Sequence, residues 1–435
     1  MTGLLRFPIE NNSYFYPSTS LSFIFSEKLK AKFLNFGKLR LGWAKVGNDT
    51  DPYNLAKVYQ PGDNFGKNPT FSIPNRLNNS SLKPEQTSNI ELGLEAKLFN
   101  NRIGIDVALY NANTSNQIIP IGTTAATGYN EQFINAGLIN NKGIEIQLTT
   151  TPIRRGDFTW TWGLNFAKNL NKIVELNADD PSLLNVPLAD GGFSSSLNAY
   201  EGRSFGTIMG KDYLYDNNGN KLTDGHGFYL ATPGYVPIAD ILPDFTGGIF
   251  TSLRYKSLSL SALVDYKIGG NIFSTTNMWG KYSGIFEETA EGDIREKGKI
   301  AVGKIAKLDA EGSPILNSDG KTYETTGEDE KTALPAQSYF FANGGYNIAA
   351  ADVYDASFVK LKEVALSFTF PKSITNKLRM SELSLSIVGR NLAILYKNLP
   401  HLDPDFVQST SNIQGIEGGQ TPSTKSWGVN LNVKF

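Results

Sequence analysis

Alternation of apolar and polar residues recurs along almost the whole chain and constrains its fold more than any other feature. In residues 90–98, Ile, Leu and Ala occupy the even positions, while Glu, Gly and Lys occupy the odd ones. In residues 427–435, Trp, Val, Leu and Phe alternate with Gly, Asn and Lys. Because successive side chains of a strand point to opposite faces, each such segment has one apolar and one polar face.

We predict eleven strands from this pattern. They cover residues 14–26, 36–48, 90–98, 103–109, 138–152, 158–166, 244–256, 258–268, 356–370, 380–396 and 427–435. Many reach the roughly 10 residues that a tilted membrane strand needs, which exceeds the roughly 5–6 residues of an ordinary strand. In 356–370 the apolar residues shift from odd to even positions after Leu361, which predicts a β-bulge near Lys362–Glu363.

The connections between these strands alternate strictly between short and long. The short ones lie at 26–35, 100–101, 154–157, 256–257 and 371–378, and the long polar ones at 49–86, 112–137, 170–243, 270–355 and 397–422. We expect short helical turns in 26–35 and 371–378. Transmembrane β-barrels have short periplasmic turns and long extracellular loops, whereas long loops are uncommon in compact domains. The sequence therefore predicts an all-β, antiparallel transmembrane β-barrel, partial because eleven strands are odd in number.

Composition excludes several other classes of protein. No run of roughly 20 apolar residues occurs, so a membrane protein built of helices is excluded. The net charge of -1, with acidic and basic residues interspersed, offers no basic stripe for nucleic acid. The chain has no cysteine, which excludes disulfides and thiolate metal sites.

Aromatic residues stand beside several short turns: Phe99, Phe158, Tyr255 and Phe370. This placement is typical of the aromatic girdle at a membrane interface. Aromatic residues at the strand edges of a soluble core are the alternative interpretation.

Several long segments carry a resemblance to a known family. They are YFYPSTSLSFIFSE (14–27), LRLGWAKVGN (39–48), LKPEQTSNIELGLEAKLFNNRIGIDVALYNANTSNQI (82–118), ATGYNEQFINAGLINNKGIEIQLTTTPI (126–153), FTWTWGLNFAKNLNKIVEL (158–176), EGRSFGTI (201–208), PDFTGGIFTSLRYKSLSLSALVDYKIGGNIF (243–273) and SFVKLKEVALSFTFP (357–371). In this order they resemble the C-terminal part of the SusC/RagA-type TonB-linked (TonB-dependent) outer-membrane transporters of Bacteroidetes. The final TKSWGVNLNVKF resembles an outer-membrane insertion signal.

The resemblance implies a barrel of about 22 strands with an N-terminal plug. It implies TonB-dependent uptake of oligosaccharides or peptides across the outer membrane of a Gram-negative bacterium, with a SusD-like lipoprotein as an extracellular lid. Outer-membrane lipid would contact the barrel, and TonB would act through an N-terminal part that is missing here. We expect residues 1–435 to be the C-terminal part of the barrel, without plug or signal peptide, and interpret Met1 as the start of a fragment. We expect no enzymatic activity, no cofactor and no metal.

Ligand binding is expected in the longest loop, which contains five aromatic residues. They are Trp279, Tyr282, Phe340, Phe341 and Tyr346. Apolar rings stack on sugar faces, and loops carry recognition. Packing of these rings onto the barrel rim or the lid protein is the alternative. The polar residues of the strands, such as Glu91, Glu95, Asn165 and Asn430, would face the lumen.

For the other candidate residues, a structural role is favoured over a binding or catalytic one. Asp216–Asn220 resembles the start of a calcium loop, but its glycine is misplaced for that motif, so a turn is favoured there and in 317–324. The acidic residues of 287–293 fit a solvated loop face. His226 and His401 lack a partner motif for hydrolysis or metal binding. In 399–406, Pro and Asp residues predict a fixed turn.

Two other functions stay open from the sequence. A secreted all-β glycan-binding module would share the alternation, with its apolar faces packed into a protein core. A glycoside hydrolase would need two carboxylates on opposed strands, which a sequence cannot place.

Overall fold

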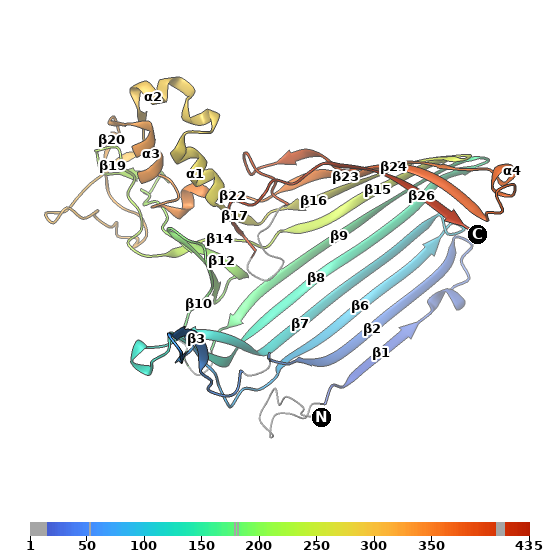
Figure 1. Ribbon diagram of the computed structural model, residues 1–435, viewed down its shortest axis with the longest axis horizontal. Coiled ribbons are helices and arrows are strands. Elements are labelled where there is room, and N and C mark those ends of the chain that lie inside the picture. The colour runs from blue at the N-terminus through green and yellow to red at the C-terminus, as the bar shows by residue number, and fades with distance from the viewer. Residues whose placement is uncertain (1–14, 52–53, 178–179, 181, 406–413) are drawn as a thin grey trace.

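A computed structural model of the chain describes residues 15–51, 54–177, 180, 182–405 and 414–435. One antiparallel sheet dominates it, and each strand of this sheet pairs with the next one along the chain (Figure 1). The strands in spatial order are β1 (Ser18–Phe23), β2 (Leu34–Asn48), β6 (Glu85–Leu98), β7 (Ile103–Gly122), β8 (Glu131–Arg155), β9 (Phe158–Glu175), β15 (Phe245–Tyr255), β16 (Leu258–Ile268), β23 (Phe358–Thr369), β24 (Glu382–Lys397) and β26 (Ser426–Lys434). All eleven predicted strands are confirmed, although residue 14 of the first lies outside the described residues.

Four strands extend well beyond the alternating segments from which we predicted them, and one of them, β6, begins at Glu85 instead of residue 90. β7 has 20 residues and β8 has 25, and their pairing continues to Gly122↔Glu131. β9 continues to Glu175. Residues 110–117 are polar at most positions, so alternation disappears there while the backbone ladder persists. With these extensions the strands are longer than the roughly 10 residues that cross a membrane, and their extra length supports the long loops.

The predicted bulge in β23 is confirmed at Lys362. On β16, Val264 pairs with Leu361 and Leu263 pairs with Glu363, so Lys362 has no partner in the ladder. The pairing with β24 shifts at the same place. The extra residue restores the apolar phase, because the apolar residues on both sides of it then share one face.

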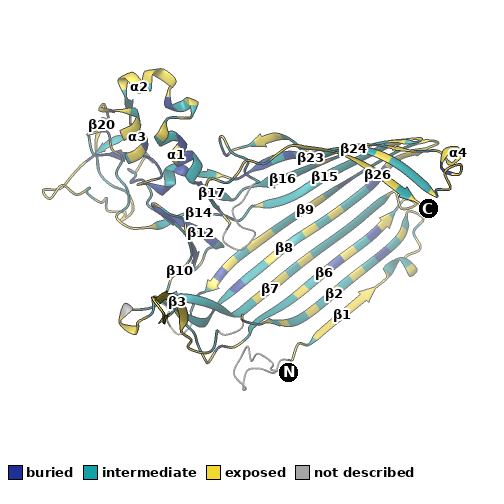
Figure 2. Cartoon of the chain, in the orientation of Figure 1, coloured by how far each residue is buried: buried dark blue, intermediate teal, exposed yellow. Residues whose placement is uncertain are grey.

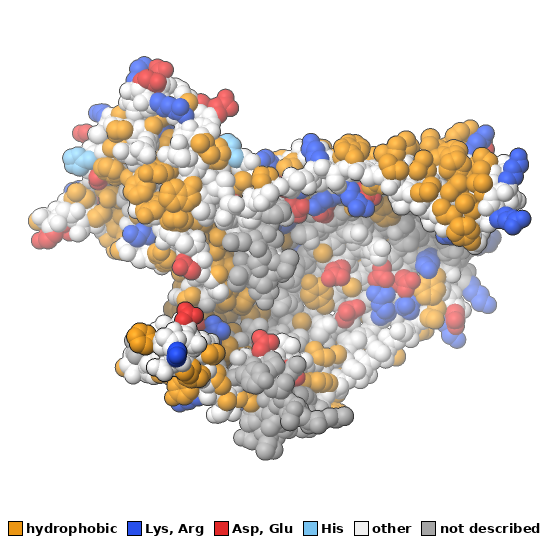
Figure 3. Space-filling model, viewed as in Figure 1, with side chains coloured by type: hydrophobic (Ala, Val, Ile, Leu, Met, Phe, Trp, Pro, Cys, Tyr) orange, Lys and Arg blue, Asp and Glu red, His pale blue; other side chains and the backbone are white. Residues whose placement is uncertain are grey.

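The register places side chains of one kind in rows across neighbouring strands. One apolar row runs Leu21, Leu41, Leu92, Leu109 and Ile144, and one polar row runs Lys38, Glu95, Asp106, Gln147 and Asn165. The sheet curves around a hollow in which acidic and basic side chains gather (Figure 3). The polar rows therefore line the concave face, and the apolar rows form the convex face.

The convex face is not the inside of a protein core. Its large side chains stay exposed, for example Leu92 at 48% and Val429 at 73%. The buried hydrophobic clusters lie in the long loops and the outer strand ends, around Leu197, Ile173, Leu222 and Leu399. Exposure along the main strands alternates accordingly (Figure 2). Within the described residues the sheet is therefore not one layer of a two-layer sandwich.

Short turns and long loops lie at opposite ends of the sheet, as predicted (Figure 1). The turn between β6 and β7 places Phe99, Asn100 and Asn101 at positive φ, a conformation that asparagine tolerates. The two predicted helical turns are η2 (Phe25–Glu27) and α4 (Lys372–Thr375). At this end Tyr255 is paired with Phe158, so predicted girdle residues stand side by side.

The long loops contain more regular structure than their polar sequence predicted. Their strands are β3 (Gln60–Phe65), β4 (Asn68–Ser72), β5 (Arg76–Leu77), β10 (Asn185–Asp190), β11 (Ser195–Tyr200), β12 (Phe205–Gly210), β13 (Leu222–Thr223), β14 (Val236–Asp240), β17 (Asn271–Ser274), β18 (Lys299–Ile300), β19 (Lys304–Ala306), β20 (Thr325–Asp329), β21 (Ala333–Leu334), β22 (Val353–Asp355) and β25 (Ile416–Glu417). Their helices are η3 (Ala125–Thr127), α1 (Thr275–Ser283), η4 (Glu287–Thr289), η5 (Glu291–Asp293), α2 (Ile294–Lys297), α3 (Ala336–Ala342) and η6 (Ala349–Asp352).

These elements join distant parts of the chain. β10, β11, β12 and β14 form a sheet of four strands, while β13 pairs with β19, and β17 pairs with both β22 and β25. No helix in the described part of the chain has the length and apolar character to cross a membrane.

We predict that an arginine is tolerated on the concave face and not on the convex one. Leu109→Arg, on the convex face of β7, should lower the free energy of unfolding in lipid vesicles by roughly 2–4 kcal/mol if it lies near the bilayer centre. Ala108→Arg is the matched control, because Ala108 pairs with Glu145 on the concave face. Denaturant titration of the barrel measures both values, and equal losses would contradict the assignment of the two faces.

Candidate functional site

Ion pairs on the concave face join strands β2, β6 and β7. Arg40 donates two hydrogen bonds to Asp106, of 2.7 and 3.0 Å, and lies 3.7 Å from Glu95. The ammonium of Lys38 lies 3.0 Å from the same Glu95 carboxylate. Each of these four charged side chains therefore has a partner of opposite charge, and together they carry no net charge on the concave face.

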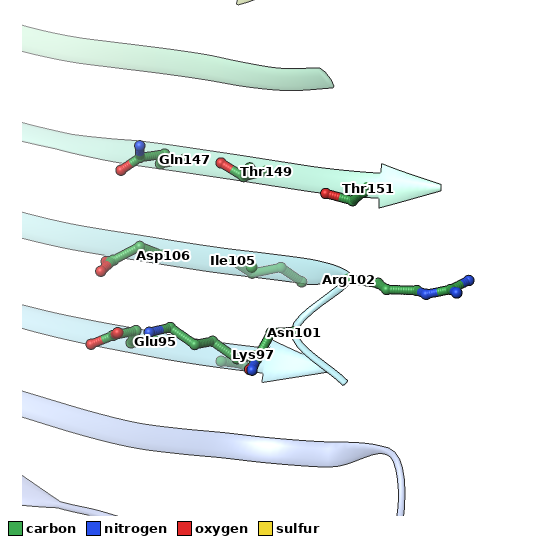
Figure 4. A pocket seen from close by; sticks show the side chains of 11 residues that line it. Glu95, Lys97, Asn101, Arg102, Ile105, Asp106, Gln147, Thr149 and Thr151 are labelled. Carbon is green, nitrogen blue, oxygen red and sulfur yellow. The ribbon is translucent and has the colours of Figure 1, made fainter. Parts of the chain in front are cut away.

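A recess on this face lies near the short turns (Figure 4). Glu95 and Lys97 reach it from β6, Asp106 from β7, and Gln147 and Thr149 from β8, while Arg102 points away past the strand end. Its carboxylates serve the ion pairs described above. The recess can therefore form hydrogen bonds with a passing solute or another part of the protein, and nothing in it resembles a paired acid and base.

The lumen residues predicted from the sequence share this face. Glu95 and Asn165 belong to one polar row, Glu91 pairs with Tyr110, and Asn430 pairs with Ser386. Their contact with a solute stays a prediction.

Four of the five predicted loop aromatics form one cluster with Phe193. The ring centroids lie 4.4 Å apart for Phe341 and Tyr346, 5.5 Å for Tyr282 and Phe341, and 5.6 Å for Trp279 and Tyr282. Phe193 contacts Trp279 at 5.3 Å and Tyr346 at 5.4 Å. Trp279, Phe341, Tyr346 and Phe193 are exposed at their outer surfaces. We call these five residues the aromatic cluster.

The fifth predicted residue, Phe340, lies elsewhere. Its side chain is buried, contacts the ring of Tyr339 and has the Lys299 ammonium 4.9 Å from its centroid. Phe193 was not predicted. It follows two glycines in a polar loop far from the other four in sequence, and only the folding of that loop brings it to them.

Buried polar contacts hold the helix that carries Trp279 and Tyr282. Ser274 caps α1 by accepting the N–H of Asn277, and the buried carboxylate of Glu417 accepts the hydroxyls of Ser274 and Thr276. These contacts fix the helix start in the small sheet of β17 and β25.

A buried ion pair fixes the other end of this region. Lys281 on α1 lies 2.5 Å from Asp352, which also accepts the N–H of Gly345 beside Tyr346. Burial raises the pKa of Tyr354 well above its usual range, so its hydroxyl stays protonated and donates to Asp352. Buried ion pairs and hydrogen bonds therefore hold the elements that carry the aromatic cluster in place.

Loops 170–243 and 270–355 are joined by Glu330 and Asn343. The Glu330 carboxylate accepts the N–H groups of Gly227, Lys331 and Thr332, at 2.9–3.0 Å. Burial alone would raise the pKa of Glu330, but these donors hold it at about 2. Asn343 accepts the N–H of Tyr229 and donates to the carbonyl of Gly227. The two loops consequently fold as one body.

The remaining sequence candidates occupy structural positions. Asp216 accepts the N–H groups of Asn218 and Asn220 within a turn, and Asp319 organises the turn in 317–324 in the same way. The acidic residues of 287–293 lie on η4 and η5. Among the residues that the structure describes, no three His, Asp or Glu side chains are grouped to hold a metal.

Comparison with known proteins identifies the family. The model of the TonB-dependent receptor-like β-barrel matches residues 3–296, more than half of the chain. The chain belongs to this family. The resemblance seen in the sequence is thereby confirmed.

Relatives and solved structures agree with this assignment. TonB-dependent receptor P3 of Formosa agariphila is 26% identical over 98% of this chain and 42% of its own length. TonB-dependent receptor SusC of Bacteroides thetaiotaomicron is 26% identical over 60% of this chain and 28% of its own length. A chain of the RagAB peptide importer has the same fold, with a TM-score of 0.70, 20% identity, and coverage of 99% of this chain and 44% of that one. The chain thus spans less than half the length of these proteins.

We predict that Glu330→Gln loosens the contact between the two loops. The change removes a buried charged acceptor from three N–H donors, so the local stability should fall by about 1–3 kcal/mol. Because the folded pKa of about 2 lies below the ordinary value of 4.5, the carboxylate stabilises fully above about pH 4.5 and loses its effect as the pH falls through about 2. Hydrogen exchange of residues 224–230 measures this. Glu328→Gln, at an exposed position of β20, is the control, and unchanged exchange in Glu330→Gln would contradict the prediction.

Proposed function

We propose that this chain forms part of the channel wall and the outer loops of a TonB-dependent importer in the outer membrane of a Gram-negative bacterium. The observation that carries the proposal is the single curved sheet with an exposed apolar convex face and a polar concave face. The convex face fits acyl chains, and the concave face fits a water-filled passage. A secreted glycan-binding module would leave this large apolar face in water, so we do not favour it.

Residues 1–435 would be the C-terminal part of the barrel. Neighbouring strands of the sheet alternate in direction, so β1 and β26, the first and the eleventh, run the same way. They cannot pair antiparallel with each other, and closing the barrel needs an odd number of further strands. Open edges are not tolerated in lipid, because unpaired N–H and C=O groups are costly there. The coverage of 42–44% of P3 and of the RagAB chain supports further strands and a plug outside these residues.

The partners follow from the same proposal. TonB would act through a segment outside these residues, and a SusD-like lipoprotein would cover the outer loops. The solute would be a peptide, as for the RagAB peptide importer to which this chain is similar, or an oligosaccharide, as the family resemblance implies. We assign no enzymatic activity, because the Glu95 and Asp106 carboxylates of the recess form ion pairs and the relatives are named as receptors.

The import role is tested by uptake of labelled oligosaccharides and peptides in cells with and without the protein. Uptake of one class should require the protein and stop when a protonophore collapses the proton gradient, because TonB draws on that gradient. Uptake that continues without the protein, or that ignores the protonophore, would contradict the proposal.

We further propose that the aromatic cluster contacts the incoming solute. Its exposed rings offer faces for sugar rings or for apolar peptide side chains. The polar contacts beneath α1 keep the rings in place, so little order would be lost on binding.

We predict that Trp279→Ala weakens solute capture. Loss of one stacking ring is expected to lower affinity about 2- to 10-fold, seen as a higher half-saturation concentration with an unchanged maximal uptake rate. Phe228→Ala removes an exposed loop ring outside the cluster and is the matched control. An equal effect of both changes, or no effect of Trp279→Ala, would contradict solute binding and leave the cluster with a packing role alone.

A further inference from the structure

The segment Leu399–Asp405 lies between the channel wall and the outer loops and is bound to both. On the wall, the ammonium of Lys360 in β23 lies 2.5 Å from Asp403 and 3.2 Å from Asp405. Lys362 also pairs with Asp405, and it lies 3.7 Å from Asp265 on β16. We call these contacts the lysine clamp.

The bulge of β23 builds this clamp. Lys360 pairs with Asp265, which continues the polar row of the concave face. In a regular strand the side chains of Lys362 and Glu363 would point to opposite faces. Because Lys362 is the extra residue, both point to the concave side, where Lys362 meets Asp405 and Glu363 meets Arg390. The bulge that first appeared as a phase shift in the sequence thus adds a second lysine to the wall.

On its outer side the same segment contacts the loop of α1 and η4. The ring of His401 stacks on Phe286, with centroids 3.7 Å apart and planes 7° from parallel. Its Nε2 lies 3.1 Å from Glu288. Asn277 on α1 donates to the carbonyl of Pro400 at 3.4 Å. The segment therefore connects the wall to the helix that carries Trp279.

The two halves of the clamp differ in burial. Lys360 and Asp403 are sealed, with side-chain exposures of 1% and 8%, while Lys362 and Asp405 are exposed at 27% and 31%. Burial would raise the pKa of Asp403, but the Lys360 ammonium and the Ser423 hydroxyl lower it, so Asp403 stays charged. A recess lined by Lys362 and Arg390 opens beside the exposed half. The exposed half can therefore be reached from the channel.

We propose that the lysine clamp is a releasable latch that positions the outer loop of α1 and η4 from the channel wall. While the clamp is closed, Leu399–Asp405 holds this loop down. When the clamp opens, the segment and the loop move together, so the state of the wall is transmitted to the outer surface. Lys360 and Lys362 are thus positioning residues. The inference rests on the proposed import role only in treating this wall as the lining of the channel.

The test follows the accessibility of one introduced cysteine in the complete protein in outer membranes, with any cysteine outside residues 1–435 replaced by serine. The chain contains no cysteine, so Leu399→Cys is unique within it, and Leu399 is buried at 1% exposure. Its labelling by a membrane-impermeant maleimide should be slow in the parent protein. Lys360→Gln leaves Asp403 and Asp405 without their buried partner and should speed labelling at least about tenfold. Lys360→Arg keeps the charge and should restore most of the protection.

Lys38→Gln is the matched control, because Lys38 forms an ion pair with Glu95 on the same face. Gel mobility of the unheated protein shows whether each barrel is folded. If Lys360→Gln does not assemble, Lys362→Gln gives the same comparison at the exposed half. Labelling as slow as in Lys38→Gln would overturn the latch. Because labelling reports loop position and not uptake, this failure would leave the import proposal intact.

Discussion

The pairing of backbone N–H and C=O groups between strands is the constraint on which the rest of the structure depends. In hydrocarbon these groups have no water to bind, so every strand within the sheet must be bonded along both edges. Sequential antiparallel pairing meets this need with very short turns, as at Asn100–Asn101. It also fixes the two faces, since a register slip of one residue would turn every apolar side chain of a strand toward the concave face.

The bulge at Lys362 interrupts this regular pairing. Lys362 is left without a partner in the ladder, but its side chain points to the concave face, where it binds a segment of the outer loops. Above the sheet, the loops stabilise each other through buried polar groups such as Glu330, Asn343 and Glu417. The wall and the outer loops are therefore joined by ion pairs and hydrogen bonds as well as by the buried apolar clusters at the outer strand ends.

The main sheet was predictable from the sequence, while the loops were not. Alternation is a local signal, and it located all eleven strands and even the bulge after Leu361. Loop structure depends on contacts between distant residues. β13 pairs with β19, and Phe193 contacts Trp279, although the local sequence around these residues does not predict their partners. For the same reason Phe340 could not be distinguished from Phe341, since neighbours in a helix point in different directions and only packing decides which is buried.

The central claim is that the convex face contacts acyl chains while the concave face lines a wet channel. The most direct test is to place single fluorescent labels at consecutive positions of β6, through cysteines at residues 91–94, and to measure quenching by brominated lipids. Strong quenching at Leu92 and Leu94 and weak quenching at Glu91 and Gly93 is the result we predict. Equal quenching at all four positions, or protection of the leucines from lipid, would contradict the account.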